Sequence, residues 1–396
     1  MAQQGQHDAA RPSLRRIALE WGRIGCIGFG GPPTHIALLR GLCVEREGWI
    51  AAADFEDGIA ATNLLPGPAS TQLAILTAWQ LRGLPGALVG GLCFIVPGLV
   101  LILALAALFL AGSPPRWVLG AAAGAGSAVA AVAVHAAVGL VPASRQRMGG
   151  ARAQRGRWIG YGLAGGVAAS LAGPWLVLVL IGAGLIEVAV RTAGRNRPSP
   201  GGGGRAAWPL PLAVAAPGAA GLAALAWVAF KVGALSYGGG FVIIPLMQSD
   251  AVHRYHWMTD AQFLNAVALG QITPGPVVQT VAVVGYAAAG VGGGLLAAAV
   301  AFAPSFLFVL LGGSHFDRLR ADPGVQAFLT GAGPAVIGAI AGSAIPLALA
   351  LQHAWQYAVL AAAAVWLLAG RRGVVSALLG AGALGVAASW AGWPVT

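Results

Sequence analysis

The chain has 396 residues, of which 58% are hydrophobic and only 9% are charged, whereas soluble domains carry roughly 25% charged residues. This composition excludes a soluble globular fold. The clearest uncharged stretches, residues 84–111, 117–141 and 325–351, are long enough to cross a hydrocarbon core of roughly 30 Å. The net charge of +11 is carried mainly by short loops between apolar segments, as the positive-inside bias predicts. We therefore expect a lipid bilayer and no nucleic acid as the surroundings of this chain.

The fold class that follows is an all-α polytopic membrane protein with roughly ten or more hydrophobic segments. Residues 1–14 are predicted to form a disordered N-terminal tail, and residues 15–190 the first of two repeat units. Its first apolar segment carries Arg23 and is broken at Gly28-Phe29-Gly30-Gly31-Pro32-Pro33. His35 follows this break directly. Because proline suits the first position of a helix, a new half-helix is expected to begin near Pro33.

A second break in the first repeat reads Leu65-Pro66-Gly67-Pro68. Asn63 comes just before it, and Ser70 and Thr71 fall in the first turn of the helix expected after Pro68. Glu56 and Asp57 lie in the preceding segment. The N-terminus of a half-helix presents unpaired N–H groups and about half a positive charge. Each break of this kind is therefore a candidate anion site.

Residues 191–208 are rich in Gly, Pro and Arg and are predicted to be a basic cytoplasmic linker. A second repeat, residues 209–396, follows it in the same register. Phe29 matches Tyr237, Trp49 matches Trp257 and Pro66 matches Pro274, and each pair is 208 residues apart. Chance similarity between apolar segments would not keep one gapless register across aromatic residues and prolines. The chain is thus predicted to contain one unit used twice.

Loop charge predicts that the two units have opposite orientations. Arginines flank the apolar stretch 158–190 in the first half, whereas Arg371 and Arg372 sit in the middle of the corresponding stretch in the second. Basic loops stay in the cytoplasm, so the units would be inserted in opposite senses. Such an inverted repeat is typical of secondary transporters, in which substrate sites lie near the midplane where the repeats meet.

Four broken segments, two from each repeat, are predicted to converge on one small multivalent anion. Arg23 and Lys231 share a repeat position and could contribute positive charge. Snorkelling to the interface, or pairing with an acid such as Glu20, is the alternative for both. The candidate substrate-binding residues are Arg23, Lys231, Gly30, Gly31, Asn63, Gly67, Pro68, Ser70, Thr71, Gly238, Gly239, Gln271, Gly275 and Pro276.

Glu56, Asp57 and His35 are candidates for proton coupling, with a solvated loop cluster as the alternative for the two acids. We expect no cofactor, metal site or catalytic residue, because the sequence has no zinc motif and no nucleotide-binding loop. An enzyme is therefore disfavoured. An anion channel stays open as an alternative, since it would use the same helix dipoles.

At these residues the sequence resembles the chromate transporter family. The Phe29-Gly30-Gly31-Pro32 and Pro66-Gly67-Pro68 clusters, together with Arg23 and Asn63, carry the resemblance, and their echoes extend it to both halves. The resemblance implies the long two-domain form, placed in the inner membrane and exporting chromate, with sulfate or another oxyanion as the alternative cargo. It implies secondary transport driven by a proton or voltage gradient. The oligomeric state stays open, with a dimer as one option.

The second repeat departs from the first at Gly240 in place of Pro32 and at Gln271 in place of Asn63. The two halves are therefore not expected to contact the substrate equally.

Overall fold

A computed structural model describes residues 12–63, 65, 67–172, 176–193, 221–236, 243–312 and 321–395. Every regular element in these ranges is helical, which confirms the all-α prediction. Within them, five helices are long and apolar enough to cross a membrane. They are α4 (Ala69–Phe109), α5 (Arg116–Met148), α7 (Leu176–Ala193), α11 (Thr280–Gly312) with the short turn before it, and α13 (Pro323–Leu349).

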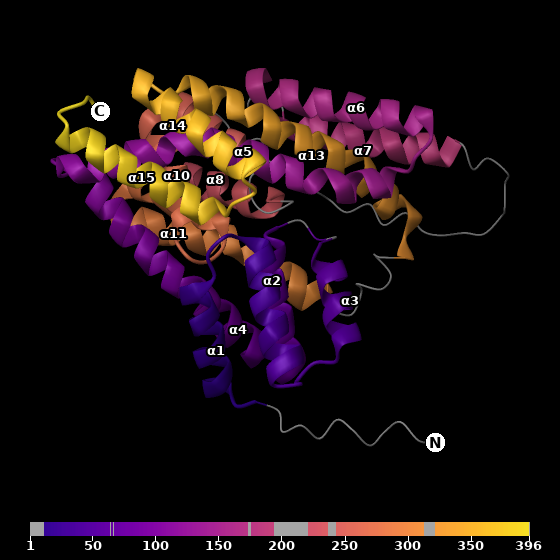
Figure 1. The fold of residues 1–396 in the computed structure, drawn as a ribbon. Coiled ribbons are helices and arrows are strands. Elements are labelled where there is room, and N and C mark those ends of the chain that lie inside the picture. Colours follow the sequence, from indigo (N-terminus) through magenta and orange to yellow (C-terminus); the bar gives the residue numbers. More distant parts are fainter. Residues whose placement is uncertain are drawn as a thin grey trace, which may run out of the picture.

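The N-terminal elements are short and gather together, away from α6, α7 and α14 (Figure 1). Helix α1 (Leu14–Ile27) begins after Ser13, whose hydroxyl accepts the N–H of Arg16 at 3.2 Å. Helix α2 (Pro32–Arg40) begins at the first proline of the Gly/Pro cluster and continues into a π-helical turn, η1 (Gly41–Arg46). Helix α3 (Ala52–Thr62) leads to the second break.

Helix α4 is in fact a tight helical hairpin. Its backbone leaves helical geometry at Arg82 and Gly83, where Gly83 has a φ of +59° that a side chain would strain. The carbonyl oxygen of Ala78 lies 2.2 Å from where a Cβ on Gly86 would stand, so the two arms pack directly against each other. The first arm, 69–81, would be about 20 Å long at 1.5 Å per residue, which is too short to cross a bilayer alone.

Element bounds in the second half recur at the sequence offset. Helix α8 (Leu222–Leu235) has the 14-residue length of α1 and begins 208 residues after it. The π-helical turn η4 (Ser249–Arg254) likewise begins 208 residues after η1. Helix α11 turns at Gly290, with a φ of +63°, as α4 does at Gly83. The remaining elements before α11 are α9 (Ile243–Gln248), α10 (Asp260–Ile272) and η5 (Val277–Gln279).

The C-terminal hairpin of each half packs on the long helix of the other half. Glycines allow this close approach: Gly331 of α13 lies against the carbonyl of Ala183 in α7, and Gly124 of α5 lies against that of Ala381 in α15. The halves therefore interlock. The hairpin of the first half consists of α6 (Arg152–Val167), η2 (Ala168–Ala172) and α7. The hairpin of the second half consists of α14 (Ala354–Ala364), η6 (Val365–Ala369) and α15 (Val374–Trp390).

The second arms of α4 and α11 occupy equivalent places in the two halves and pack against each other. Phe306 fills the space beside Gly91, and Leu103 fills the space beside Gly294, each with an atom 2.5 Å from the position of a Cβ. Residue numbers rise along α4 as they fall along α11, so the two arms are antiparallel.

Two predicted boundaries fall at the edges of the described ranges. Helix α7 continues through Arg191 to Ala193, and the remainder of the predicted linker lies outside the described residues. Residues 1–11 of the predicted tail also lie outside them.

Candidate functional site

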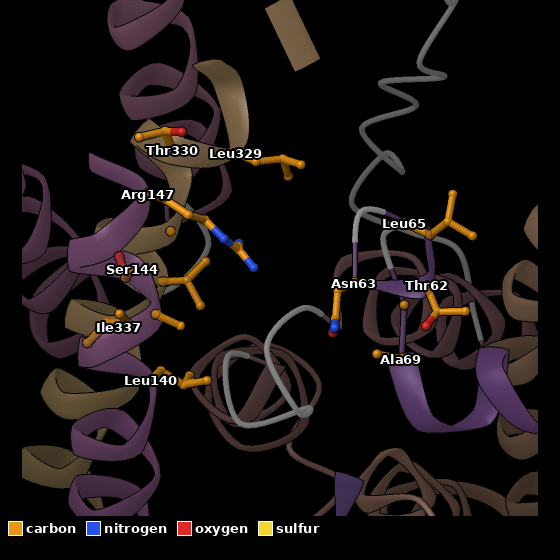
Figure 2. Close-up of a pocket in the computed structure, with 14 residues that line it drawn as sticks. Thr62, Asn63, Leu65, Ala69, Leu140, Ser144, Arg147, Leu329, Thr330 and Ile337 are labelled. Carbon is orange, nitrogen blue, oxygen red and sulfur yellow. The ribbon is translucent and has the colours of Figure 1, made fainter. Parts of the chain in front are cut away.

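A cavity of about 100 Å³ lies between the second break of the first half and the helix pair α5 and α13 (Figure 2). A single water needs roughly 10–15 Å³ by this kind of measure, so the cavity can hold a small hydrated ion. Its lining residues are Thr62, Asn63, Leu65, Gly67, Ala69, Leu140, Ala143, Ser144, Arg147, Leu329, Thr330, Gly333, Val336 and Ile337.

The lining of the cavity is positively charged. Arg147 is the charged residue of its lining, and Figure 2 shows its side chain reaching from the last turn of α5 into the gap, toward the wall that contains Asn63. The hydroxyls of Thr62 and Thr330 already donate to carbonyls of their own helices, at 3.0 Å and 2.6 Å. The Arg147 guanidinium and the Asn63 amide contribute N–H groups to this lining, which is the donor type that binds oxyanions.

The N-terminus of α4 adds a second source of positive potential. Gly67 lines the cavity with a φ of +121°, and Pro68 is the N-cap residue, so α4 begins at Ala69. The first N–H groups of a helix have no partner within it, and the peptide dipoles place partial positive charge there. The residues that follow, Ser70 and Thr71, are both buried.

His35 connects the first break to this helix start. Its Nε2 lies 2.8 Å from the Gly28 carbonyl, which can only accept, so Nε2 carries the proton and donates. In the neutral ring, Nδ1 then accepts from the Ser70 hydroxyl at 3.1 Å. The same Gly28 carbonyl accepts the N–H of Gly275 at 3.0 Å. A break from the first half thus meets a break from the second half at one carbonyl oxygen.

The predicted substrate-binding residues fall into separate places. Asn63 and Gly67 line the cavity, with Pro68, Ser70 and Thr71 directly behind them. The second break of the second half, with Gln271, Gly275 and Pro276, is buried. The Nε2 of Gln271 has no hydrogen-bonding partner among the described residues. Gly30 and Gly31 lie at the start of α2 with positive φ, and Gly238 and Gly239 lie outside the described residues.

The two cations at equivalent positions differ in their surroundings. Arg23 is exposed on α1 and does not line the cavity. Lys231 pairs with the buried carboxylate of Asp250, and its Nζ lies 5.9 Å from the centre of the Trp227 ring. Glu20, the acid considered as a partner for these cations, pairs instead with Arg16 and Arg46.

The residues predicted for proton coupling are also dispersed. Glu56 and Asp57 are exposed on α3, where Glu56 pairs with Arg40, whereas His35 is fully buried in the network described above.

Arg147 is the site residue that sequence reasoning did not single out. In the sequence it is one of several arginines near the end of a long apolar segment. What distinguishes it is the packing of α5 against α13, which brings Leu140 near Ile337 and Arg147 near Thr330 along one wall. No local signal in the sequence reports that packing.

The two halves are not in the same conformation around this cavity. The stretches Gly124-Ala125-Gly126 and Gly331-Ala332-Gly333 are equivalent, 207 residues apart. At Gly126, the side chain of Asn265 from α10 fills the space, with Oδ1 2.4 Å from the position of a Cβ. At Gly333, which lines the cavity, the nearest atom to that position is the Ser144 hydroxyl at 3.5 Å. Asp57, the counterpart of Asn265 in α3, is exposed.

Comparison with known proteins places the chain in a family. The chromate transporter family matches residues 15–188 and again residues 223–386, covering both halves. A chromate transport protein of Cupriavidus metallidurans is 33% identical over 352 residues, which span 86% of this chain and 84% of the relative. A chromate transport protein of Pseudomonas aeruginosa is 30% identical over 355 residues, spanning 82% and 79%.

A probable chromate transport protein of Synechococcus elongatus is 28% identical over 345 residues, spanning 85% of this chain and 84% of the relative. No solved structure matches this chain. The family match in both halves, together with the long apolar helices, identifies the chain as a multi-pass membrane protein of the chromate transporter family, in its long two-domain form.

Proposed function

We propose that this protein is a secondary-active carrier that exports chromate from the cytoplasm across the inner membrane. The observation that carries the proposal is the cavity in which Arg147 lies across from Asn63 and the N-terminus of α4. An arginine and a helix N-terminus together suit a tetrahedral dianion, because both supply N–H donors and positive potential. The curated relatives named for chromate transport support chromate as the cargo.

The proposal includes opposite insertion of the two halves. The antiparallel packing of the second arms of α4 and α11 supports it, because equivalent spanning helices in oppositely inserted copies run in opposite directions. Loop charge supports an opening of the cavity toward the cytoplasm, from which an exporter takes its cargo. Arg145, Arg152 and Arg155 lie close in sequence to Arg147, so the cavity is next to a basic segment that the positive-inside bias assigns to the cytoplasm.

A carrier is favoured over a channel by the difference between Gly126 and Gly333. In an alternating-access cycle, the two halves exchange conformations, so that the open side closes as the closed side opens. Here α10 is already packed on α5, while α3 leaves the equivalent face of α13 exposed to the cavity. We infer that α3 moves onto α13 when the anion is released on the opposite side. Asp57 would then lie against Gly333.

The coupling ion is proposed to be the proton, with the membrane potential as the other driving force. Glu56 and Asp57 are on the helix that would move, which supports them as the groups that exchange protons with water. His35 bridges the Gly28 carbonyl and Ser70, so its protonation would reverse the donor and acceptor at Ser70.

The test is uptake of radiolabelled chromate into everted membrane vesicles, in which cytoplasmic export becomes inward transport. We expect saturable uptake that responds to an imposed pH gradient and exceeds that of vesicles lacking the protein. Molybdate, sulfate and phosphate are compared at the same concentration. Uptake of sulfate without chromate would overturn the proposed cargo, and single-channel conductance far above carrier turnover would overturn the carrier mechanism.

A further inference from the structure

A buried hydroxyl that has no partner among the described residues lies near Gly67, which lines the cavity. Ser305, on the second arm of α11, is 0% exposed, and its Oγ has no hydrogen-bonding partner among the described residues. Leaving a buried polar group unpaired is unfavourable, so such groups in native proteins call for a specific reason. A ligand that pairs with the hydroxyl only when it is bound is such a reason.

Ser305 faces the break that starts α4. Its Oγ lies 3.4 Å from where a Cβ on Gly67 would stand, and Gly67 lines the cavity. Thr71, in the first turn of the same helix, is also 0% exposed and its Oγ1 lacks a partner among the described residues. Two hydroxyls without a partner among the described residues therefore accompany one helix N-terminus, next to a cavity that contains Arg147.

The equivalent place in the other half is built differently. The counterpart of Ser305, 207 residues earlier, is Gly98. The Pro274 carbonyl lies only 2.1 Å from the position of a Cβ on Gly98, so no side chain fits there, and the Gln279 amide donates to the Ile95 carbonyl at 2.8 Å. A serine is thus found opposite the Pro-Gly-Pro break that borders the cavity. A glycine is found opposite the equivalent break, against which the chain packs closely.

We propose that Ser305 and Thr71 form an inner subsite that donates hydrogen bonds to the transported oxyanion at the N-terminus of α4. This inference rests on the proposed function and adds to it the residues that hold the anion beyond Arg147. Ser305 lies about three residues, or roughly 5 Å, from the middle of its helical arm, a depth that suits a midplane site between repeats.

The test is equilibrium binding of radiolabelled chromate to the purified protein, combined with its thermal stability in detergent. Ser305→Ala should weaken chromate binding at least tenfold, since a hydrogen bond to a charged group is lost. The same variant should unfold at an equal or higher temperature without chromate, because the hydroxyl it removes has no partner. Ser343→Ala is the matched control: Ser343 is equally buried on α13, but its Oγ already donates to Ile340 at 2.7 Å.

Thr71→Val provides a second variant, with the same expected loss of binding, should Ser305→Ala not fold. Wild-type protein that binds and transports chromate, together with unchanged affinity in Ser305→Ala or Thr71→Val, would overturn the inner subsite alone. Wild-type protein that neither binds nor transports chromate would overturn the proposed function itself. A purely structural role for Ser305 would lower the unfolding temperature and leave the affinity of the folded fraction unchanged.

Discussion

Helices α3 and α10 are equivalent elements with different surroundings. Each precedes a Pro-Gly-Pro break, and α10 begins 208 residues after α3. From Phe263 to Gln271, α10 is buried throughout except for the half-buried Asn265, and it packs on α5 at Gly126. Helix α3 exposes Glu56 and Asp57 and leaves a cavity between its C-terminal end and α13.

This difference shows that one scaffold accommodates both a packed and an open arrangement of the same elements. The glycines that receive α10 are present again in α13, so the second docking face exists although α3 does not occupy it. Two arrangements of equivalent segments within one chain are what a carrier needs, because its two end states then differ by an exchange rather than by new contacts.

Cross-linking tests whether the two halves exchange conformations, and it should have the largest effect on transport. In a chain without Cys26, Cys43 and Cys93, Asn265→Cys with Gly126→Cys should form a disulfide in resting membranes. A disulfide needs Cα atoms about 4.4–6.8 Å apart. The bond should abolish transport until it is reduced, because α10 could no longer leave α5. Full transport by the oxidised pair would contradict an exchange between the halves.

The reciprocal pair, Asp57→Cys with Gly333→Cys, should cross-link only while chromate is being transported. Asp57→Cys with Gly139→Cys is the control, since nothing lies within 4 Å of a Cβ on Gly139.

Removing the charge of Arg147 from the cavity should have the next largest effect on transport. Arg147→Gln should raise the KM for chromate about ten- to hundredfold, because hydrogen bonds to charged groups contribute about 1.5–3 kcal/mol. The measurement is initial uptake into everted vesicles over a range of chromate concentrations. Arg145→Gln is the matched control two residues away: its guanidinium lies over the Trp158 ring at 4.9 Å and does not line the cavity. Equal KM values for both variants would remove Arg147 from the site.

Replacing Lys231 in the second half should mainly lower the stability of the protein. Lys231→Gln leaves the carboxylate of Asp250 buried without its cation, at an expected cost of about 2–3 kcal/mol. Thermal unfolding in detergent measures this cost. Lys231→Gln combined with Asp250→Asn should recover most of the lost stability. A double variant that is stable yet unable to bind chromate would instead support a direct role of Lys231 in anion binding.

Replacing Arg23, the counterpart of Lys231 in the first half, should have the smallest effect on stability and transport. Arg23 is exposed and forms no ion pair with a described residue, so Arg23→Gln should change stability by less than about 0.5 kcal/mol. We expect a modest loss of transport, about twofold, because the charge contributes to the potential near the first break only at long range. Unchanged uptake at low ionic strength would exclude Arg23 from the anion pathway.

Local signals in the sequence predicted a large part of this molecule. Composition predicted an all-helical membrane protein, which the structure confirms. Prolines and glycines predicted the breaks, and helices begin at or next to them: α2 begins at Pro32, and Pro68 and Pro276 are N-cap residues. These features follow from the sequence because proline fixes φ, glycine permits positive φ, and burial in lipid requires helical backbone pairing.

The partners of the charged residues and the location of the cavity depended on the tertiary structure. Lys231 meets Asp250 across two helices, and Arg147 reaches the cavity because α5 packs on α13, a helix about 200 residues away in the chain. The contrast between α3 and α10 has a partial signal in the sequence, since Glu56 and Asp57 of α3 stand where α10 has Leu264 and Asn265. Packing between distant helices decides which face is covered, and that choice depends on the whole set of small-residue contacts at once.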